Sequence, residues 1–172
     1  MKIYIACGLT HVPRDVFHEH CDFLHRLADR LRSEPARHQV RYALVDSDPQ
    51  LAEKPFEERA RLCYLWDREM VREAELVIAE ASFPAIGLGI ELQIAEANDT
   101  PILLCFRDYH ANRATPVDYV NPDQSTHSLQ IGEGFVSLMA LGLPSVYRII
   151  QYGDREDGLG RISETVRLLR RG

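Results

Sequence analysis

Short apolar runs alternate with segments of helical periodicity along most of the chain, and this alternation constrains the fold more than any other feature. The runs are rich in Ile, Val and Leu, which is typical of buried strands. Strands are expected at residues 3–6, 40–45, 76–79, 102–106 and 146–150. Helices are expected at residues 13–31, 55–74, 89–97, 135–141 and from about 159 onward. Such an order predicts a parallel sheet with helices on both faces and right-handed crossovers.

The sequence therefore predicts an α/β fold, a three-layer sandwich around a five-stranded parallel sheet of the flavodoxin or Rossmann type. A chain of 172 residues is most often one domain, so the domain is expected to span residues 1–172. Residues 107–134 are polar and contain proline, and we expect them to form a long loop. A loop of that length in a compact domain is usually functional or disordered.

The balance of charge argues against a general binder of nucleic acids or anionic membranes. The chain has 20 basic and 26 acidic residues, a formal net charge of −6. A local basic pocket could still hold one phosphate. No apolar run approaches the roughly 20 residues that a membrane span needs, and the apolar start of the chain reads as a strand rather than a signal peptide. We expect a cytoplasmic protein that contacts neither nucleic acid nor membrane.

The cysteines and histidines show no pattern of a metal site or a disulfide framework. The four cysteines are scattered, with no CxxC pair and no histidine at ligand spacing, which is typical of free cytosolic thiols. Most of the seven histidines are expected at the surface. His11, in the loop after the first strand, is the one kept as a candidate ligand contact. No metal and no cofactor are therefore predicted.

Glycines and acids gather where the expected strands end. Residues 8–11 follow the first strand, Asp46 and Asp48 follow the second, and a turn at residues 84–91 follows the third. The carboxyl ends of parallel strands share one edge of the sheet, and ligands bind there near the point where the strand order reverses. A ligand site is therefore expected at this edge.

Glu91 is the acid that the turn after the third strand presents. One explanation needs no ligand, because the helix macrodipole stabilises an acid in the first turn of a helix by roughly 0.3–1 kcal/mol. Gly87 and Gly89 are likewise a weak signal, since two glycines make a tight strand-to-helix turn with or without a ligand and the full GxGxxG spacing is absent. Glycine also lets a substrate or another backbone come close. The residues alone leave both explanations open.

Asp67 is a second candidate, on the helix that precedes the third strand. It is either a solvated acid paired with a neighbouring arginine or an acid at the edge of an apolar cleft. The placement near Tyr64 and Trp66 favours the cleft. Two carboxylates in one cleft can divide the chemistry, one acting as a nucleophile while the other handles protons.

The stretch from residue 75 to 106 resembles the nucleoside 2-deoxyribosyltransferase superfamily, and within it the 2'-deoxynucleoside 5'-phosphate N-hydrolases. Those hydrolases carry a strand of the type VVVAE, a turn of the type PSLGVGYELG and a next strand like ILCLF. Here the sequence reads VIAE at 77–80, PAIGLGIEL at 84–92 and ILLCF at 102–106. Looser matches at residues 1–8, in the helix that carries Asp67 and at 137–139 extend the resemblance over most of the chain.

The resemblance implies the catalytic residues. Glu91 matches the nucleophile that attacks the anomeric carbon of a (deoxy)ribosyl group and displaces the base, forming a glycosyl-enzyme intermediate. Asp67 matches the aspartate that positions the nucleophile and manages the proton on the leaving base.

The resemblance also implies substrate-binding residues. Gly8 matches a loop that lines the sugar and the base, and Tyr4 matches an aromatic residue of the first strand. Gly87 and Gly89 match the glycines on either side of the substrate-facing turn. Ser137 matches a serine that reaches the neighbouring subunit's site and binds the 5' phosphate. A homodimer with shared active sites is therefore implied.

Two departures from the hydrolase pattern fall in the substrate site. Six residues before the glutamate the nucleotide hydrolases carry Ser and the transferases carry Asp, whereas this chain has Ala85. Alanine can neither donate to a phosphate nor accept from a 5'-hydroxyl. The hydrolases' loop of the type GSIRGGR is replaced by GLTHVPR at residues 8–14, with Leu9 in the Ser position and His11 in the Arg position. We expect His11 or Arg14 to replace the lost phosphate contacts.

The sequence thus predicts a glycosidase that hydrolyses the N-glycosidic bond of a (deoxy)nucleoside 5'-monophosphate. Base exchange between nucleosides is the alternative within the same chemistry. A non-catalytic nucleotide sensor, in which Glu91 only holds a ribose, is the alternative outside it. A flavodoxin-like domain for another ligand is disfavoured because no phosphate loop rich in Ser and Thr follows the first strand.

Overall fold

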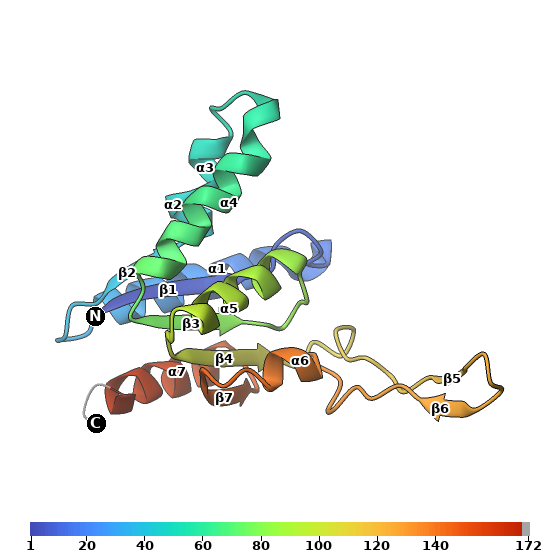
Figure 1. The fold of residues 1–172 in the computed structure, drawn as a ribbon. Helices are drawn as coiled ribbons and strands as arrows, with labels where there is room; N and C mark the ends of the chain where they lie inside the picture. The colour runs from blue at the N-terminus through green and yellow to red at the C-terminus, as the bar shows by residue number, and fades with distance from the viewer. Residues whose placement is uncertain (170–172) are drawn as a thin grey trace.

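A five-stranded parallel sheet lies between two layers of helices in the computed structural model, which describes residues 1–169 (Figure 1). The strands are β1 (Lys2–Cys7), β2 (Gln39–Tyr42), β3 (Leu76–Glu80), β4 (Ile102–Arg107) and β7 (Val146–Tyr152). Their order is β2-β1-β3-β4-β7, and every neighbouring pair is parallel. The predicted fold class is confirmed. This is the flavodoxin order, in which the direction of winding reverses between β1 and β3.

Helices cover both faces of the sheet. The long ones are α1 (Arg14–Arg32), α4 (Phe56–Glu73), α5 (Ile86–Ala97) and α7 (Arg155–Leu169), and the short ones are α2 (Ala43–Asp46), α3 (Asp48–Leu51) and α6 (Leu138–Leu141). The core on one face packs α1 and α7 against the sheet, and the core on the other packs α5 and the carboxyl end of α4.

The central strand β3 is buried along its whole length, as its uninterrupted apolar run predicts for a parallel strand covered on both sides. Successive side chains of a strand point to opposite faces. Val77 and Ala79 therefore join the α4/α5 core, while Leu76 and Ile78 join the α1/α7 core. Glu80, two residues after Ile78, lies on the α1/α7 side as well.

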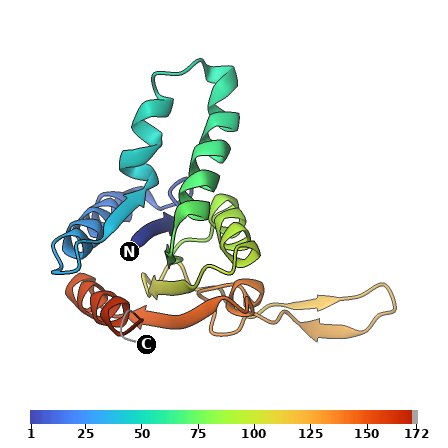
Figure 2. The ribbon, with the colours of Figure 1, turned by 60° about the vertical axis from the view of Figure 1, so that its left-hand side comes forward.

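The helices α2, α3 and α4 form an arm that projects from the sheet (Figures 1 and 2). Within α4 only Met70 and Val71 are buried, both near its carboxyl end, because the rest of the helix extends beyond the sheet. The expected second strand at 40–45 is wrong at its end. The strand stops at Tyr42, whose backbone N–H donates to Asp46 Oδ2 at 2.9 Å, so the acid closes the helical turn that follows.

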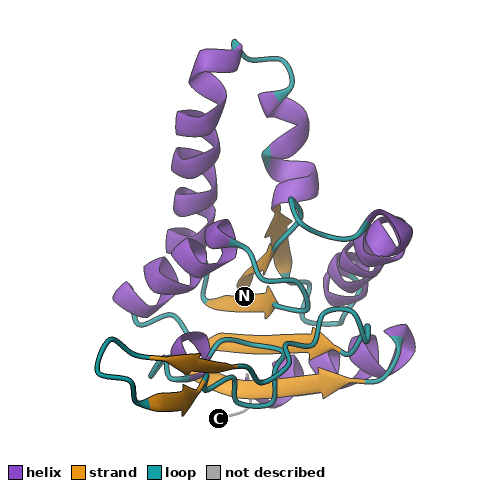
Figure 3. Ribbon diagram, turned by 90° about the vertical axis from the view of Figure 1, so that its right-hand side faces the viewer, coloured by secondary structure: helices purple, strands orange, loops and turns teal. Residues whose placement is uncertain are grey.

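The segment expected to be a loop contains a second, two-stranded sheet. Strands β5 (Asp118–Val120) and β6 (Thr126–Ser128) pair antiparallel, and all their residues are exposed. This hairpin extends away from the main sheet (Figures 1 and 3). Its two stems meet where Ala114 N–H donates to Gly134 O at 2.8 Å.

Two further expectations concerned the cysteines and membrane-spanning segments. All four cysteines are free thiols. Among residues 1–169 no helix has the length and apolar character needed to cross a membrane.

Candidate active site

Glu91 lies buried on α5, where it meets Tyr4 of the neighbouring strand β1. The Tyr4 hydroxyl donates to Glu91 Oε1 at 2.6 Å, and both side chains are almost fully buried. The second oxygen, Oε2, is also buried and has no hydrogen-bond partner among the residues described. One oxygen of this carboxyl group is thus held in place while the other is left without a partner in the protein. Tyr4, implied only as a strand-one aromatic, is a direct partner of the candidate nucleophile.

Burial sets the proton affinity of Glu91. The pKa of this carboxyl group is raised to about 8: burial is the largest cause, the Tyr4 hydrogen bond opposes the rise, and the charge of Asp67 adds to it. Burial likewise raises the pKa of Tyr4 well above its ordinary value, with the negative charge of Glu91 adding to it. Tyr4 therefore remains a hydroxyl donor when Glu91 is ionised.

The start of α5 differs from the sequence-based expectation. The helix begins at Ile86, so Glu91 lies in its second turn and the first turn has no acid. Stabilisation by the first-turn macrodipole therefore does not explain why a glutamate is buried here. Gly87 and Gly89 are inside the helix rather than in a tight turn before it. A Cβ added at either glycine would meet no atom within 4 Å, so this side of α5 is open.

Asp67 is half-buried on α4, and its environment is the polar base of the arm. Ser47 Oγ donates to Oδ1 at 2.7 Å, and Cys63 Sγ lies 3.4 Å from Oδ2 as a thiol donor. Asp67 forms no salt bridge with an arginine among residues 1–169. In the described chain Asp67 is thus held by Ser47 and Cys63 and not by an arginine. Its charge raises the pKa of both Glu91 and Tyr4, which puts the two carboxyl groups in one electrostatic site.

Gly8 fits tightly against the turn that leads into α5. A Cβ on Gly8 would lie 2.7 Å from Phe83 O and 2.8 Å from Ala85 Cβ, so only glycine permits this approach. Ala85 is the N-cap residue of α5 and makes no side-chain capping bond. The end of β1 and the turn before α5 are thus in direct contact at the carboxyl edge, as expected from strand order.

Ser137 and His11 are placed less centrally. Ser137 is the N-cap residue of α6, where its Oγ accepts from Ala140 N–H at 3.3 Å. It also lines a largely apolar cavity of about 90 Å³ together with Ala85 and Gly89. Within the described chain Ser137 forms no hydrogen bond with Glu91. His11 is exposed in the loop after β1, beyond the same strand end.

Glu80 is a second buried acid, which sequence reasoning quoted only as part of a strand motif. It is fully buried on the face opposite to Glu91. The Tyr152 hydroxyl donates to Oε1 at 3.0 Å, Ser82 donates to the same oxygen, and His20 Nε2 lies 3.6 Å from Oε2. Burial raises the pKa of Glu80, whereas the neighbouring His20 and Ser82 oppose the rise. This network joins the ends of β3 and β7 to α1.

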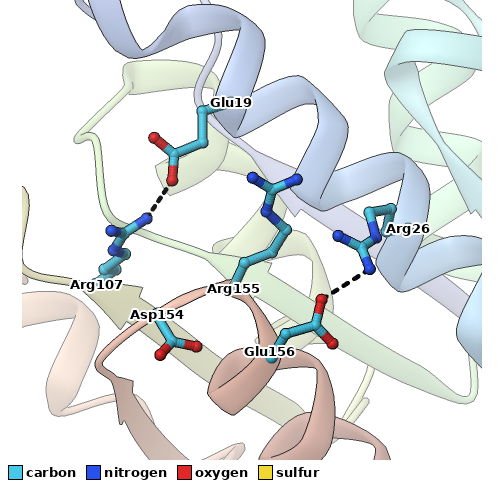
Figure 4. Close-up of a pocket in the computed structure, with 6 residues that line it drawn as sticks. All are labelled: Glu19, Arg26, Arg107, Asp154, Arg155 and Glu156. Atoms are coloured by element: carbon cyan, nitrogen blue, oxygen red, sulfur yellow. Dashed lines mark hydrogen bonds and ion pairs between the residues drawn. The ribbon is translucent and has the colours of Figure 1, made fainter.

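A charged cavity of about 400 Å³ lies on the α1/α7 side of the molecule (Figure 4). The three arginines that line it are each paired with a carboxylate: Arg107 with Glu19, Arg26 with Glu156, and Arg155 with Asp22. Because its cations are already neutralised, this cavity is a poor anion site. Neither Glu91 nor Asp67 lines it.

Metal chemistry has no obvious ligand set in the described part of the chain. Within residues 1–169 no group of three or more His, Cys, Asp or Glu side chains is arranged to hold a metal ion. The chemistry available at Glu91 and Asp67 is that of carboxylates with hydroxyl and thiol partners.

Comparison by sequence finds one related segment. No protein-family model matches the chain. A curated protein of Syntrophotalea carbinolica, provisionally named 2'-deoxynucleoside 5'-phosphate N-hydrolase 1, is 43% identical over 54 residues. The matched segment is 31% of this chain and spans only 36% of that relative's length.

Comparison by structure covers nearly the whole chain. A CMP N-glycosidase of Clostridium botulinum aligns over 96% of this chain and 99% of its own, with a TM-score of 0.57 and 15% identity. A conserved protein of Enterococcus faecalis V583 aligns over 95% of this chain and 98% of its own, with a TM-score of 0.60 and 16% identity. At these identities the overlays show a shared fold.

The sequence match over these 54 residues supports the resemblance to the 2'-deoxynucleoside 5'-phosphate N-hydrolases that the motifs indicate. Within the superfamily, a 2-deoxyribosyltransferase of Bacillus psychrosaccharolyticus aligns more loosely, over 62% of this chain and 72% of its own, with a TM-score of 0.46 and 18% identity. The sequence resemblance implied the roles of Glu91 and Asp67, and these roles stay predictions. It gave no signal for Ser47 and Cys63, whose contacts with Asp67 depend on how the arm folds.

Proposed function

We propose that the protein hydrolyses the N-glycosidic bond of a (deoxy)nucleoside 5'-monophosphate with Glu91 as the nucleophile. The observation that carries this proposal is the buried Glu91 carboxyl group, whose Oε1 is held by Tyr4 while Oε2 has no partner in the described chain. The names of the N-hydrolase and the N-glycosidase reported above support the reaction type.

The reaction follows from what these groups can do. Glu91 Oε2 attacks the anomeric carbon, the bond from that carbon to the base nitrogen breaks, and its electron pair leaves with the base. Protonation of the leaving base is assigned to Asp67 or to a water that it holds. Water then attacks the anomeric carbon of the glycosyl ester and returns one proton to the group that protonated the base. The bond to the Glu91 oxygen breaks in this step, so that the sugar leaves and the Glu91 carboxylate is regenerated. The hydrogen bond from Tyr4 stabilises the carboxylate both before attack and when it leaves.

Base exchange is the second candidate, because it uses the same intermediate and differs only in the acceptor. A nucleotide sensor remains the rival outside catalysis. A buried carboxyl group with a raised pKa and one unpartnered oxygen favours catalysis over a simple ribose contact, since a ribose-binding acid needs no isolation from water.

We also propose that two copies of the chain form a homodimer through the outer side of α5 and α6. Ile86 and Met139 are among the most exposed apolar side chains, at 87% and 88%, and Ile90 and Leu138 lie beside them on the same two helices. The apolar cavity lined by Ser137 opens between these helices. The sequence resemblance, which implies that Ser137 serves a neighbouring subunit, fits this arrangement.

The test is release of free base, measured by chromatography, from a panel of ribo- and deoxyribonucleosides and their 5'-monophosphates. Wild type is compared with Glu91→Gln and with Glu96→Gln. Glu96 is a matched control on the same helix, where its Oε2 accepts from Ser145 N–H at 2.8 Å, a bond that an amide oxygen can keep. We expect Glu91→Gln to lose at least about 1,000-fold in kcat, because no nucleophile remains, and Glu96→Gln to retain activity.

Each alternative has its own result in this experiment. A new nucleoside formed only when an acceptor base is added would identify a transferase. Binding of panel members without any base release by wild type would reject the glycosidase and leave the sensor.

A further inference from the structure

The carboxylate of Asp67 is held from both sides by side chains of its own chain. Ser47 Oγ lies 2.7 Å from Oδ1, and Cys63 Sγ lies 3.4 Å from Oδ2. Each oxygen therefore has one protein donor. A carboxylate has about four lone-pair sites, so two bonds leave capacity on both oxygens for a substrate or a water.

Ser47 occupies an unusual position for a polar residue. It is the joint between α2 and α3, with only 1% of its surface exposed, and so it is buried at the base of the arm. Its hydroxyl has a single proton. That proton has a short acceptor in Asp67, whereas the next acceptor, Ala43 O, is at 3.4 Å. A hydroxyl buried this completely and committed to one carboxylate fixes the position of that carboxylate.

Cys63 is one helical turn before Asp67 on α4, so its side chain lies on the same face of the helix. The pKa of this thiol is raised to about 11, mainly by burial and then by the charge of Asp67. The thiol is therefore protonated at neutral pH and donates to Asp67, although a thiol is a weaker donor than a hydroxyl.

The Ser47–Asp67 hydrogen bond connects two separate parts of the arm. Ser47 lies between α2 and α3 on one side of the arm, and Asp67 lies on α4 on the other side. The Ser47–Asp67 hydrogen bond thus ties the two sides together beside the site that contains Glu91. A carboxyl group on a projecting helix otherwise has several rotamers open to it, and catalysis is sensitive to displacements of about 1 Å.

We propose that Ser47, supported by Cys63, is a positioning residue that holds the Asp67 carboxylate in its catalytic orientation. The inference rests on the proposed function, since it assigns Asp67 a part in the reaction. Ser47 itself does not touch the substrate and acts only through Asp67.

The test compares Ser47→Ala, Ser47→Thr and Ser163→Ala with wild type in the base-release assay. Ser163 is a matched control because it is also a fully buried serine, but it lies on α7 in the opposite layer and its hydroxyl has no partner in the described chain. We expect Ser47→Ala to lower kcat roughly 10- to 100-fold with KM within about twofold, the effect of losing one hydrogen bond to a charged group. Ser47→Thr keeps the hydroxyl and should recover most of kcat, and Ser163→Ala should keep it.

A double-mutant cycle separates positioning from simple damage to the fold. If Ser47 acts through Asp67, Ser47→Ala has no further effect on kcat in an Asp67→Ala background. Wild type, Ser47→Ala, Asp67→Ala and the double variant are also unfolded in urea. If the two substitutions change the free energy of unfolding non-additively, the contact between Ser47 and Asp67 is confirmed. Cys63→Ala should lower kcat less than Ser47→Ala, and Cys63→Ser should match wild type.

The outcomes distinguish this inference from the proposed function. A wild type that releases base, together with a Ser47→Ala variant of full kcat, overturns the positioning role alone. An equal loss from Ser47→Ala with and without Asp67 also overturns it, because Ser47 would then act through the fold. A wild type that releases no base from any panel member overturns the proposed function and the catalytic role of Ser47 with it, while the urea cycle still reports on the contact.

Discussion

At the scale of single residues, two buried glutamates lie close in sequence but on opposite faces of the sheet. Glu80 Oε1 accepts from Tyr152 and Ser82, and His20 lies 3.6 Å from Oε2, whereas Glu91 has one donor, Tyr4. The Oε2 atom of each glutamate has no hydrogen-bond partner in the described chain. A buried carboxyl group with few partners is costly to ionise, and this cost is the physical origin of its raised pKa. The difference assigns Glu80 to structure and leaves Glu91 for chemistry.

The cost of ionising Glu91 predicts a stabilising substitution. Its pKa is about 8 in the folded protein against an ordinary value of 4.5, so between these values the folded chain keeps a proton that the unfolded chain has lost. The free energy of unfolding therefore falls as pH rises through this window. Glu91→Gln removes the dependence and should be more stable than wild type by on the order of 1–3 kcal/mol at pH 7.

Urea unfolding at a series of pH values checks this. The advantage of Glu91→Gln should shrink toward pH 5 and reach its full size above pH 8. Glu96→Gln should show no such trend. An advantage that is constant with pH would mean that the substitution stabilises by packing rather than through ionisation.

The same pKa predicts the pH dependence of activity. Only ionised Glu91 is a nucleophile, so kcat/KM should rise with pH and level off above about 8. Tyr4→Phe removes the hydrogen bond that opposes the rise in pKa, so the ascending limb should move to higher pH and activity at pH 7 should fall roughly tenfold. Tyr147→Phe, on an exposed residue of β7, serves as the control. If the ascending limb of the pH profile of Tyr4→Phe lies at the same pH as in wild type, Tyr4 does not lower the pKa of Glu91.

The sequence located the acids but not their partners. Glu91 was found through a motif whose order of strand, turn and acid is visible in the sequence, and Asp67 through its position near Tyr64 and Trp66 and a looser match of its helix. Ser47 contacts Asp67 only because α2 and α3 fold back along α4, and no local sequence pattern predicts that packing. Cys63 lies one helical turn before Asp67, but nothing in the sequence marks it as a donor to this acid. Ser47 stood in an acidic stretch that suggested Asp46 and Asp48 instead, yet Asp46 serves the backbone of Tyr42.

At the scale of elements, the contact between the end of β1 and the turn before α5 predicts the effect of a single added carbon. Gly8→Ala would place a Cβ within 3 Å of Phe83 O and Ala85 Cβ, so the turn must shift. We expect a loss of about 1–3 kcal/mol of stability and at least a tenfold loss of kcat, because α5 and its Glu91 move with the turn.

Thermal unfolding and base release on the same preparation measure both losses. Gly160→Ala is the control, because a Cβ there meets nothing within 4 Å in the middle of α7. It should stabilise the protein by roughly 0.5–1 kcal/mol, as alanine does in helices. Full activity of Gly8→Ala would show that the turn can adapt without moving the site.

The elements also show where sequence reasoning fails. The helix α5 was expected to begin near residue 89, since two glycines favour a turn, but packing of Leu88 and Leu92 into the core extends it back to Ile86. The hairpin was missed although its turn carries an Asn-Pro-Asp signal at residues 121–123, flanked by residues with good strand propensity. Alternation over three residues is too short to stand out against a polar background.

At the scale of the whole molecule, the outer side of α5 and α6 predicts self-association. Ile86→Glu with Met139→Glu should shift the protein from dimer to monomer in sedimentation velocity, because two charges on an apolar contact are costly to bury. Both side chains are exposed in the single chain, so its folding should not change. Leu168→Glu on α7 is the control, and a wild type that sediments as a monomer would exclude the proposed dimer.

The hairpin of β5 and β6 leaves and rejoins the body at one point, where Ala114 and Gly134 are joined by a hydrogen bond. Gly134 has a φ of +89°, and a Cβ there would lie 2.7 Å from Ala114 O, so the closed stem depends on this glycine. The hairpin and the main sheet are separate sheets, so no ladder pairing of the five parallel strands involves the segment between these two residues. We therefore expect this segment to tolerate insertions and deletions that the main sheet would not.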